Sequence, residues 1–174
     1  LKLFGPEGTK HMADKVLEAY EEDIRYRLYS EQPANNEGWR VETHEIRNTG
    51  LVFEDDNVKV EAFRVPHGSW PEAWGYRFTT PDTVIVISGD TAPSDVLKQF
   101  SQGADVLIHE VYSEEGFAKK EPQWQKYHAK NHTSTTELGR LAAEVEPKLL
   151  ILYHLLLWGS THETLIDEVK TCLL

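Results

Sequence analysis

The second half of this 174-residue chain alternates apolar segments with segments of helical character. We predict strands at the segments rich in Val, Ile and Leu, which are residues 83–88, 105–111 and 148–153. We predict helices at residues 93–102, 133–145 and 161–173, the first of them opened by Pro93, a favoured first position of a helix. Strands that alternate with helices indicate a mixed α/β fold in which helices cover a sheet.

The first half has a different pattern. A strand at residues 1–4 ends at a Gly-Pro turn, and a helix with Thr9 as its N-cap is expected over residues 9–30. Beyond a polar loop at residues 33–38, short strand candidates form a meander at residues 41–47, 51–53, 58–65 and 74–79. Residues 113–131 are polar and dotted with aromatic side chains, and they have no clean period. We predict a long functional loop there, with a helical turn as an open alternative.

Composition narrows the class of protein. The formal net charge of −11 disfavours non-specific binding of nucleic acid, although a local cationic or metal-bearing cleft can override the global sign. No stretch approaches the roughly 18 uninterrupted apolar residues that span a bilayer, so we expect no membrane partner. Cys172 is the only cysteine, which excludes an intrachain disulfide and favours a reducing compartment, the cytoplasm.

Polar side chains stand where four predicted strands end: His67, Asp90, Glu110 and His154. In sheets flanked by helices, ligands gather at strand ends, and imidazole with carboxylate is a ligand set that zinc takes. Each residue also has a simpler interpretation: a solvated or capped histidine, an N-cap role for Asp90 in the following helix, or an edge-strand charge at Glu110. From spacing alone, both interpretations stay open.

Several short motifs follow one another along most of the chain: Gly-Leu-Val-Phe-Glu-Asp-Asp (50–56), Val-Pro-His-Gly (65–68), Trp-Gly-Tyr-Arg-Phe (74–78), Ser-Gly-Asp-Thr (88–91), Ala-Asp-Val-Leu-Ile-His-Glu (104–110), His-Thr-Ser-Thr-Thr (132–136) and Leu-Ile-Leu-Tyr-His (150–154). Gly-Asp-Thr alone would be a weak signal, whereas the ordered set is specific. Together these motifs resemble the carboxyl-terminal half of metallo-β-lactamase-fold hydrolases of the ribonuclease Z type.

The resemblance implies a four-layer α/β/β/α sandwich, of which this chain would be mostly the second half. The His-x-His-x-Asp-His ligand loop, which belongs to the amino-terminal half of this fold, does not occur in the chain, and the sequence starts at Leu1 without an initiator methionine. We therefore expect residues 1–174 to form one domain whose metal-loop half is missing. Such a chain alone would be inactive.

The resemblance also implies roles for the strand-end residues. His67 would be a ligand of a first metal ion, Asp90 would bridge two metal ions, and His154 would bind the second. The expected cofactors are two divalent metal ions, zinc or alternatively manganese. A bridged pair about 3.5–4 Å apart makes hydroxide available near neutral pH.

A second constellation would consist of Glu110 and His132. The carboxylate would orient the imidazole, and His132 would hand a proton to the leaving oxygen or steady charge on a phosphate. His132 stands before the expected helix at residues 133–145, where N-terminal N–H groups would also favour an anionic substrate. His128, four residues earlier, could ligate a metal together with His132, but an ordinary surface role is the simpler interpretation.

Two features depart from the tRNA-processing members of the family. The short connection at residues 78–83 leaves no room for a projecting arm that grips tRNA, and residues 155–159 are unusually apolar. The function implied is a metal-dependent phosphodiesterase acting on a small-molecule or nucleic-acid phosphodiester, with tRNA in doubt. Alternatives are a hydrolase of sulfate, carboxylic or lactone esters, and a non-catalytic half-domain. A homodimer is an open possibility for assembly.

Overall fold

The structure is a computed structural model, and it describes residues 1–31 and 35–173. It divides into two compact units, Leu1–Arg47 and Asn48–Leu174, each with its own sheet. The start of the polar loop predicted at residues 33–38 lies outside the described residues. Within the described part of the chain, no helix combines the length and apolar character needed to cross a bilayer.

The first unit pairs two short parallel strands, β1 (Lys2–Pro6) and β2 (Glu42–Ile46), with helices α1 (Thr9–Ala19) and α2 (Glu21–Tyr29) between them in sequence. The single helix predicted over residues 9–30 is therefore wrong. It is interrupted at Tyr20, which has φ −100° and ψ 10°. Three acidic residues follow directly and open α2, where negative charge is favoured by the helix dipole.

The start of α1 also differs from the prediction. Gly8, with φ 95°, is the N-cap residue, and its left-handed conformation suits a glycine. Thr9 is the first helical residue, and its hydroxyl donates to the carbonyl of Pro6 at 2.6 Å instead of capping the helix. Met12 and Val16 lie at helical spacing in α1, but both stay exposed.

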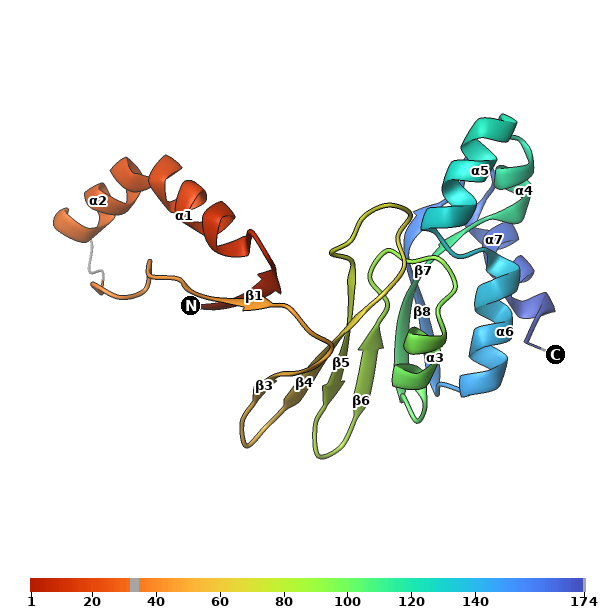
Figure 1. The fold of residues 1–174 in the computed structure, drawn as a ribbon, viewed down its shortest axis with the longest axis horizontal. Helices are drawn as coiled ribbons and strands as arrows, with labels where there is room; N and C mark the ends of the chain where they lie inside the picture. Colours follow the sequence, from red (N-terminus) through yellow and green to blue (C-terminus); the bar gives the residue numbers. More distant parts are fainter. Residues whose placement is uncertain (32–34, 174) are drawn as a thin grey trace. The chain divides into compact units, whose positions relative to one another are not determined.

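The second unit contains a six-stranded sheet in the sequential order β3 to β8 (Figure 1). The strands are β3 (Gly50–Glu54), β4 (Lys59–Arg64), β5 (Trp74–Thr79), β6 (Val84–Ile87), β7 (Val106–Tyr112) and β8 (Leu149–Leu156). Neighbours from β3 to β6 are antiparallel, whereas β6, β7 and β8 are parallel. It follows that β4, β6, β7 and β8 all run in the same direction and end at the same edge.

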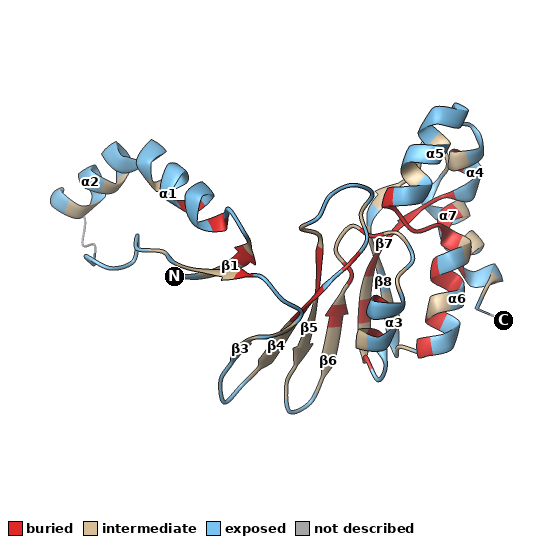
Figure 2. Cartoon of the chain, viewed as in Figure 1, coloured by how far each residue is buried: buried red, intermediate tan, exposed pale blue. Residues whose placement is uncertain are grey.

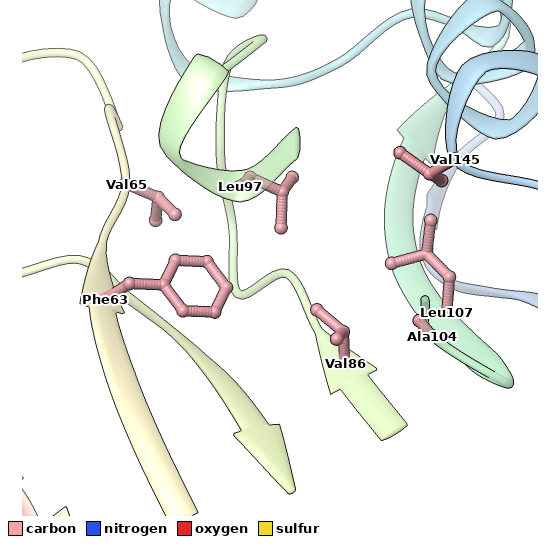
Figure 3. Packing of buried hydrophobic residues seen from close by; sticks show 7 residues of the cluster. All are labelled: Phe63, Val65, Val86, Leu97, Ala104, Leu107 and Val145. Atoms are coloured by element: carbon pink, nitrogen blue, oxygen red, sulfur yellow. The ribbon is translucent and has the colours of Figure 1, made fainter. Parts of the chain in front are cut away.

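Helices α3 (Asp95–Ser101), α6 (Thr135–Val145) and α7 (His162–Thr171) connect or follow the parallel strands and pack against the sheet. Figure 3 shows the main cluster, in which side chains of β4, β6 and β7 meet those of α3 and α6; its members are Phe63, Val65, Val86, Leu97, Ala104, Leu107 and Val145. In Figure 2 most strand residues of this unit are intermediate in exposure, and the buried ones gather on β7, on one end of β4 and β5, and on one side of α6. The core thus fixes the strands whose ends carry the polar residues.

The long loop predicted at residues 113–131 is wrong. The structure has two helices there, α4 (Glu114–Ala118) and α5 (Pro122–Asn131). Ser113 caps α4 by accepting a hydrogen bond from Gly116 N at 3.2 Å, and Pro122 stands at the first turn of α5, where it needs no N–H partner. Helical periodicity was hidden because both helices are short and α5 is mostly exposed.

Candidate functional site

Strand direction brings the polar residues of the sequence motifs to one edge of the sheet. His67 and Asp90 lie just beyond the carboxyl ends of β4 and β6, and Glu110 and His154 lie within the last part of β7 and β8. Because these four strands run in the same direction, their ends converge.

His67 opens a tight turn in which Trp70 N donates to His67 O at 3.0 Å. Its Nδ1 lies 2.7 Å from the main-chain oxygen of Asn131, at the end of α5, so the imidazole donates through Nδ1 and leaves Nε2 free to bind. A second tie joins Gly68 N to Lys130 O at 2.9 Å. Metal-binding histidines commonly donate their other ring N–H to a carbonyl in this way.

Gly68 makes that close approach possible. Its φ of 59° is in the left-handed region, and an added Cβ would lie 2.2 Å from Asn131 Oδ1. Gly89 has the same function beside Asp90, because its φ is 68° and an added Cβ would lie 2.4 Å from Trp74 O. Both turns therefore depend on glycine to place the neighbouring polar side chain.

Asp90 does not cap the helix that follows it. The N-cap of α3 is Ser94, whose hydroxyl accepts from Leu97 N at 3.2 Å. Asp90 instead faces His154, with 3.7 Å between Asp90 Oδ2 and His154 Nε2, and both side chains are partly exposed. The simpler interpretation of Asp90 as a capping residue is thereby excluded.

His154 occupies an irregular position in β8. Glu110 of β7 pairs with Tyr153 and Val111 pairs with Leu155, so His154 is the extra residue of a bulge. Its φ is 44°, a left-handed conformation that costs a non-glycine residue roughly 1–3 kcal/mol. Bulges redirect side chains and are common beside active sites, and this one turns His154 toward Asp90.

Glu110 is fully buried, and one of its carboxylate oxygens has three polar partners. Oε1 accepts from Thr91 N at 3.0 Å, from Thr133 N at 3.2 Å and faces Nδ1 of His132 at 3.2 Å. Among the described residues, Oε2 has no hydrogen-bond partner. A buried carboxylate therefore holds His132 through one oxygen and leaves the other available.

His132 lies between two helices. It is the C-cap residue of α5, and the next residues run beside the end of β7, where Tyr112 N donates to Thr133 O at 2.9 Å. The helix predicted from residue 133 begins two residues later at Thr135, behind a capping box of Ser134 and Glu137. His132 consequently lies outside the first turn of α6.

The rings of three histidines form one group. The His132 ring centroid lies 5.2 Å from that of His67 and 5.5 Å from that of His154. Ligand-type atoms of Glu110, His132 and His154 also lie within 4.8 Å of one another. The structure thus brings all five of the residues singled out in the sequence to one place, through the Asp90 contact with His154 and the Glu110 contact with His132.

These side chains fit a divalent metal ion. Imidazole and carboxylate are zinc ligands, the His67 ring is oriented by a carbonyl, and His154 is held in a strained conformation facing a carboxylate. Among the described residues, only Glu110, His132 and His154 have ligand atoms that all lie within 4.8 Å of one another. The set of His67, Asp90 and His154 is more open: Asp90 contacts His154 at 3.7 Å, and the rings of His67 and His154 lie 5.2 and 5.5 Å from that of His132. The two sets differ in whether Glu110 and His132 bind metal or act beside it.

The sequence interpretation missed the contribution of α5. The main-chain oxygen of Asn131 orients His67, and a main-chain group has no side-chain signature that could have revealed it. His128 contacts Trp158 with ring centroids 4.2 Å apart and lies 5.8 Å from the His132 ring. Partial burial lowers the pKa of His128 below its usual value, and the neighbouring His132 and Lys120 lower it further. Proline at the first turn of α5 was the available signal for this helix.

A parallel-stranded edge that presents histidines and carboxylates beside a helix-covered sheet is the arrangement of hydrolases with the metallo-β-lactamase fold. The chain belongs to this superfamily, because the family model described as "Beta-lactamase superfamily domain" matches residues 7–155. The predicted α/β fold class is confirmed by this match and by the solved structures that share the fold.

Ribonuclease Z of Mycobacterium tuberculosis (strain H37Rv) is 27% identical over 154 residues, which are 88% of this chain and 56% of that protein. The chain therefore spans little more than half the length of this curated relative. The metallo-β-lactamase fold protein YhfI from Bacillus subtilis matches 99% of this chain and 57% of its own, with a TM-score of 0.65 at 17% identity. Human tRNase Z, short form, matches 90% of this chain and 64% of its own, with a TM-score of 0.59 at 21% identity.

Proposed function

We propose that this chain carries the second half of the active site of a metal-dependent phosphodiesterase of the ribonuclease Z type. The observation that carries the proposal is the pairing of buried Glu110 with His132, next to the contact between Asp90 and His154. A positioned imidazole can act as a general acid, and nearby metal-type ligands can hold an ion that activates water, so the two together suit hydrolysis of a phosphodiester. The ribonuclease Z relative supports the reaction class.

We assign metal binding to His67, Asp90 and His154, and Asp90 would help to hold both ions. Glu110 Oε1 already accepts two main-chain N–H bonds besides facing His132, which favours a positioning role over a ligand role. When bound, divalent ions such as zinc or manganese would activate water and stabilise the charge of the reacting phosphate. Further ligands from a His-x-His-x-Asp-His loop outside these residues remain a prediction.

His132 would act on the leaving group. With Nδ1 directed at Glu110, the Nε2 atom is the position from which the ring can give a proton to the departing oxygen. Glu110 fixes the ring orientation, and the main-chain N–H groups of Thr91 and Thr133 fix Glu110. General acid catalysis of this kind contributes about 10²–10⁴-fold to a rate.

The substrate proposed is a phosphodiester, with tRNA in doubt. β5 and β6 are joined by a short turn in which Thr80 N donates to Thr83 O at 3.0 Å, so no arm extends between these strands. The apolar residues after His154 do not argue for a hydrophobic substrate, because Leu155 and Leu157 pack against the cluster formed by β7, α6 and α7. We retain the cytoplasm as the proposed compartment, because Cys172 is unpaired. A homodimer stays an open possibility for assembly.

The test uses the longest reading frame that contains these 174 residues, loaded with zinc or manganese. We expect hydrolysis of bis(p-nitrophenyl) phosphate, and loss of that activity in His132→Ala. Turnover of p-nitrophenyl acetate or sulfate without turnover of the phosphodiester would replace the proposal with the ester-hydrolase alternative. No turnover of any of these by metal-loaded protein would favour a non-catalytic module.

A further inference from the structure

A pocket of about 440 Å³ opens beside His67. Its walls are the turn that follows His67 and the last part of α5, with Trp70, Tyr127, Lys130 and Asn131 among the lining residues. Pockets that bind small ligands are commonly about 300–1,000 Å³. The pocket is therefore large enough for one aromatic ring system next to the proposed metal ligand.

Two aromatic side chains of this pocket are exposed to solvent. Trp70 is 67% exposed and Tyr127 is 51% exposed, although both line the same cavity. Exposed aromatic rings can stack on the flat ring of a ligand. The pocket thus has two aromatic side chains in its lining that an aromatic group could contact.

The charge of the pocket is opposite to that of the chain. The chain has a net charge of −11, yet among the described residues no Asp or Glu side chain lines this pocket, and Lys130 does. In the described part of the chain, Lys130 forms no ion pair with a carboxylate. Helix α5 itself carries Lys126 and Lys130 and no acidic residue. The local field therefore favours an anion.

The two walls are tied together. Gly68 N donates to Lys130 O at 2.9 Å, and the His67 ring is bound to Asn131 O at 2.7 Å. The same backbone segment that places Lys130 and Tyr127 thus also orients His67. A ligand held in the pocket would have its charged part next to the proposed metal site.

We propose that this pocket, between Trp70 and the Tyr127–Lys130 turn of α5, is the substrate subsite for an aromatic ring carried on a phosphate ester, as in a nucleotide. The proposal rests on the phosphodiesterase function and names its substrate class. Trp70 and Tyr127 contact the ring, and Lys130 contacts the phosphate. Basic residues interleaved with aromatic ones bind nucleotides in this way.

The experiment is a calorimetric titration of the full chain in EDTA, so that neither metal binding nor turnover contributes. Three ligands are compared. AMP carries both the aromatic ring and the phosphate, adenosine carries only the ring, and ribose 5-phosphate carries only the phosphate. We expect AMP to bind at least about 10-fold more tightly than either partial ligand, and Trp70→Ala to weaken AMP about 10-fold, while Trp70→Phe restores most of the affinity. Lys130→Gln should weaken AMP and leave adenosine unchanged.

Matched controls are Trp39→Ala, an exposed tryptophan of the other unit, and Lys119→Gln, an exposed lysine that does not line the pocket. Both should bind AMP as the wild-type chain does. A trinucleotide that binds more tightly than AMP identifies the end of a nucleic-acid strand as the source, and equal binding identifies a single nucleotide.

Undiminished AMP binding in Trp70→Ala, or equal binding of AMP and ribose 5-phosphate, would overturn the subsite. So would the absence of AMP binding by the wild-type chain. None of these results bears on hydrolysis of bis(p-nitrophenyl) phosphate by metal-loaded protein. The subsite and the proposed function can therefore fail separately.

Discussion

Glu110 Oε1 and His132 Nδ1 lie 3.2 Å apart in the interior of the second unit, with Glu110 fully buried and His132 nearly so. The same carboxylate oxygen accepts the main-chain N–H groups of Thr91 and Thr133. One side chain thereby joins the segment after β6, the end of β7 and the residue that we assign to acid catalysis.

Glu110→Gln should separate orientation from metal binding. The amide oxygen can still accept from Thr91 and Thr133, but hydrogen bonds to a charged acceptor are stronger, so we expect unfolding free energy to fall by about 1–3 kcal/mol. We also expect kcat to fall about 10²-fold with KM and metal content unchanged, because His132 loses its charged partner. Urea unfolding, metal analysis and steady-state kinetics measure these effects. Exposed Glu54→Gln is the control and should change none of them.

Gly89 supports a second prediction, which has a matched control in the same chain. Gly89 and Gly103 both have φ 68°, but an added Cβ would meet Trp74 O at 2.4 Å in one case and nothing within 4 Å in the other. We expect Gly103→Ala to cost about 1 kcal/mol of unfolding free energy and Gly89→Ala clearly more. Since Gly89 precedes Asp90, only Gly89→Ala should also weaken metal binding. Equal stability of the two variants would show that this turn does not require glycine.

His109 predicts a pH dependence of stability. Burial lowers the pKa of His109 from 6.5 to about 4, and its Nδ1 lies 2.6 Å from the main-chain oxygen of Glu110. Between these values the unfolded chain binds the proton and the folded chain does not, so stability present above pH 6.5 is lost as pH falls toward 4. We expect His109 to contribute about 2 kcal/mol to the loss between pH 7 and pH 5.

The measurement is urea unfolding of wild-type chain and His109→Gln in EDTA at pH 7 and pH 5. The variant starts less stable because a packed ring is removed, but its own loss on acidification should be smaller by the stated amount. Parallel losses in the two proteins would show that His109 titrates alike in the folded and unfolded chain.

The sequence predicts the sheet of the second unit well, because β6 and β7 are short segments rich in Val and Ile, a length and composition typical of buried strands. β6, β7 and β8 run in the same direction because helices connect them as crossovers between parallel strands. Asp90, which follows β6, therefore lies at the same edge as the last residues of β7 and β8. The grouping of His67, Asp90 and His154 could thus be anticipated from strand ends.

Other parts of the site have no signal in a single sequence. The bulge at His154 depends on a register shift between two apolar strands, and the apolar pattern alone does not reveal a shift. The tie from Asn131 to His67 is made by a carbonyl, and α5 has too few buried residues to show a helical period. In α1 the sequence signal is present but misleading, because Met12 and Val16 have the spacing of a buried helix face and yet are exposed.

The central claim is that His67, Asp90 and His154 bind the metal ions while Glu110 and His132 act beside them. The most direct measurement is zinc affinity, by competition with a chromophoric chelator, in wild-type protein and in single alanine variants at Asp90 and His132. The account predicts that Asp90→Ala loses zinc and that His132→Ala keeps it but loses turnover. Zinc lost in His132→Ala and retained in Asp90→Ala would contradict the account and assign the ion to Glu110, His132 and His154.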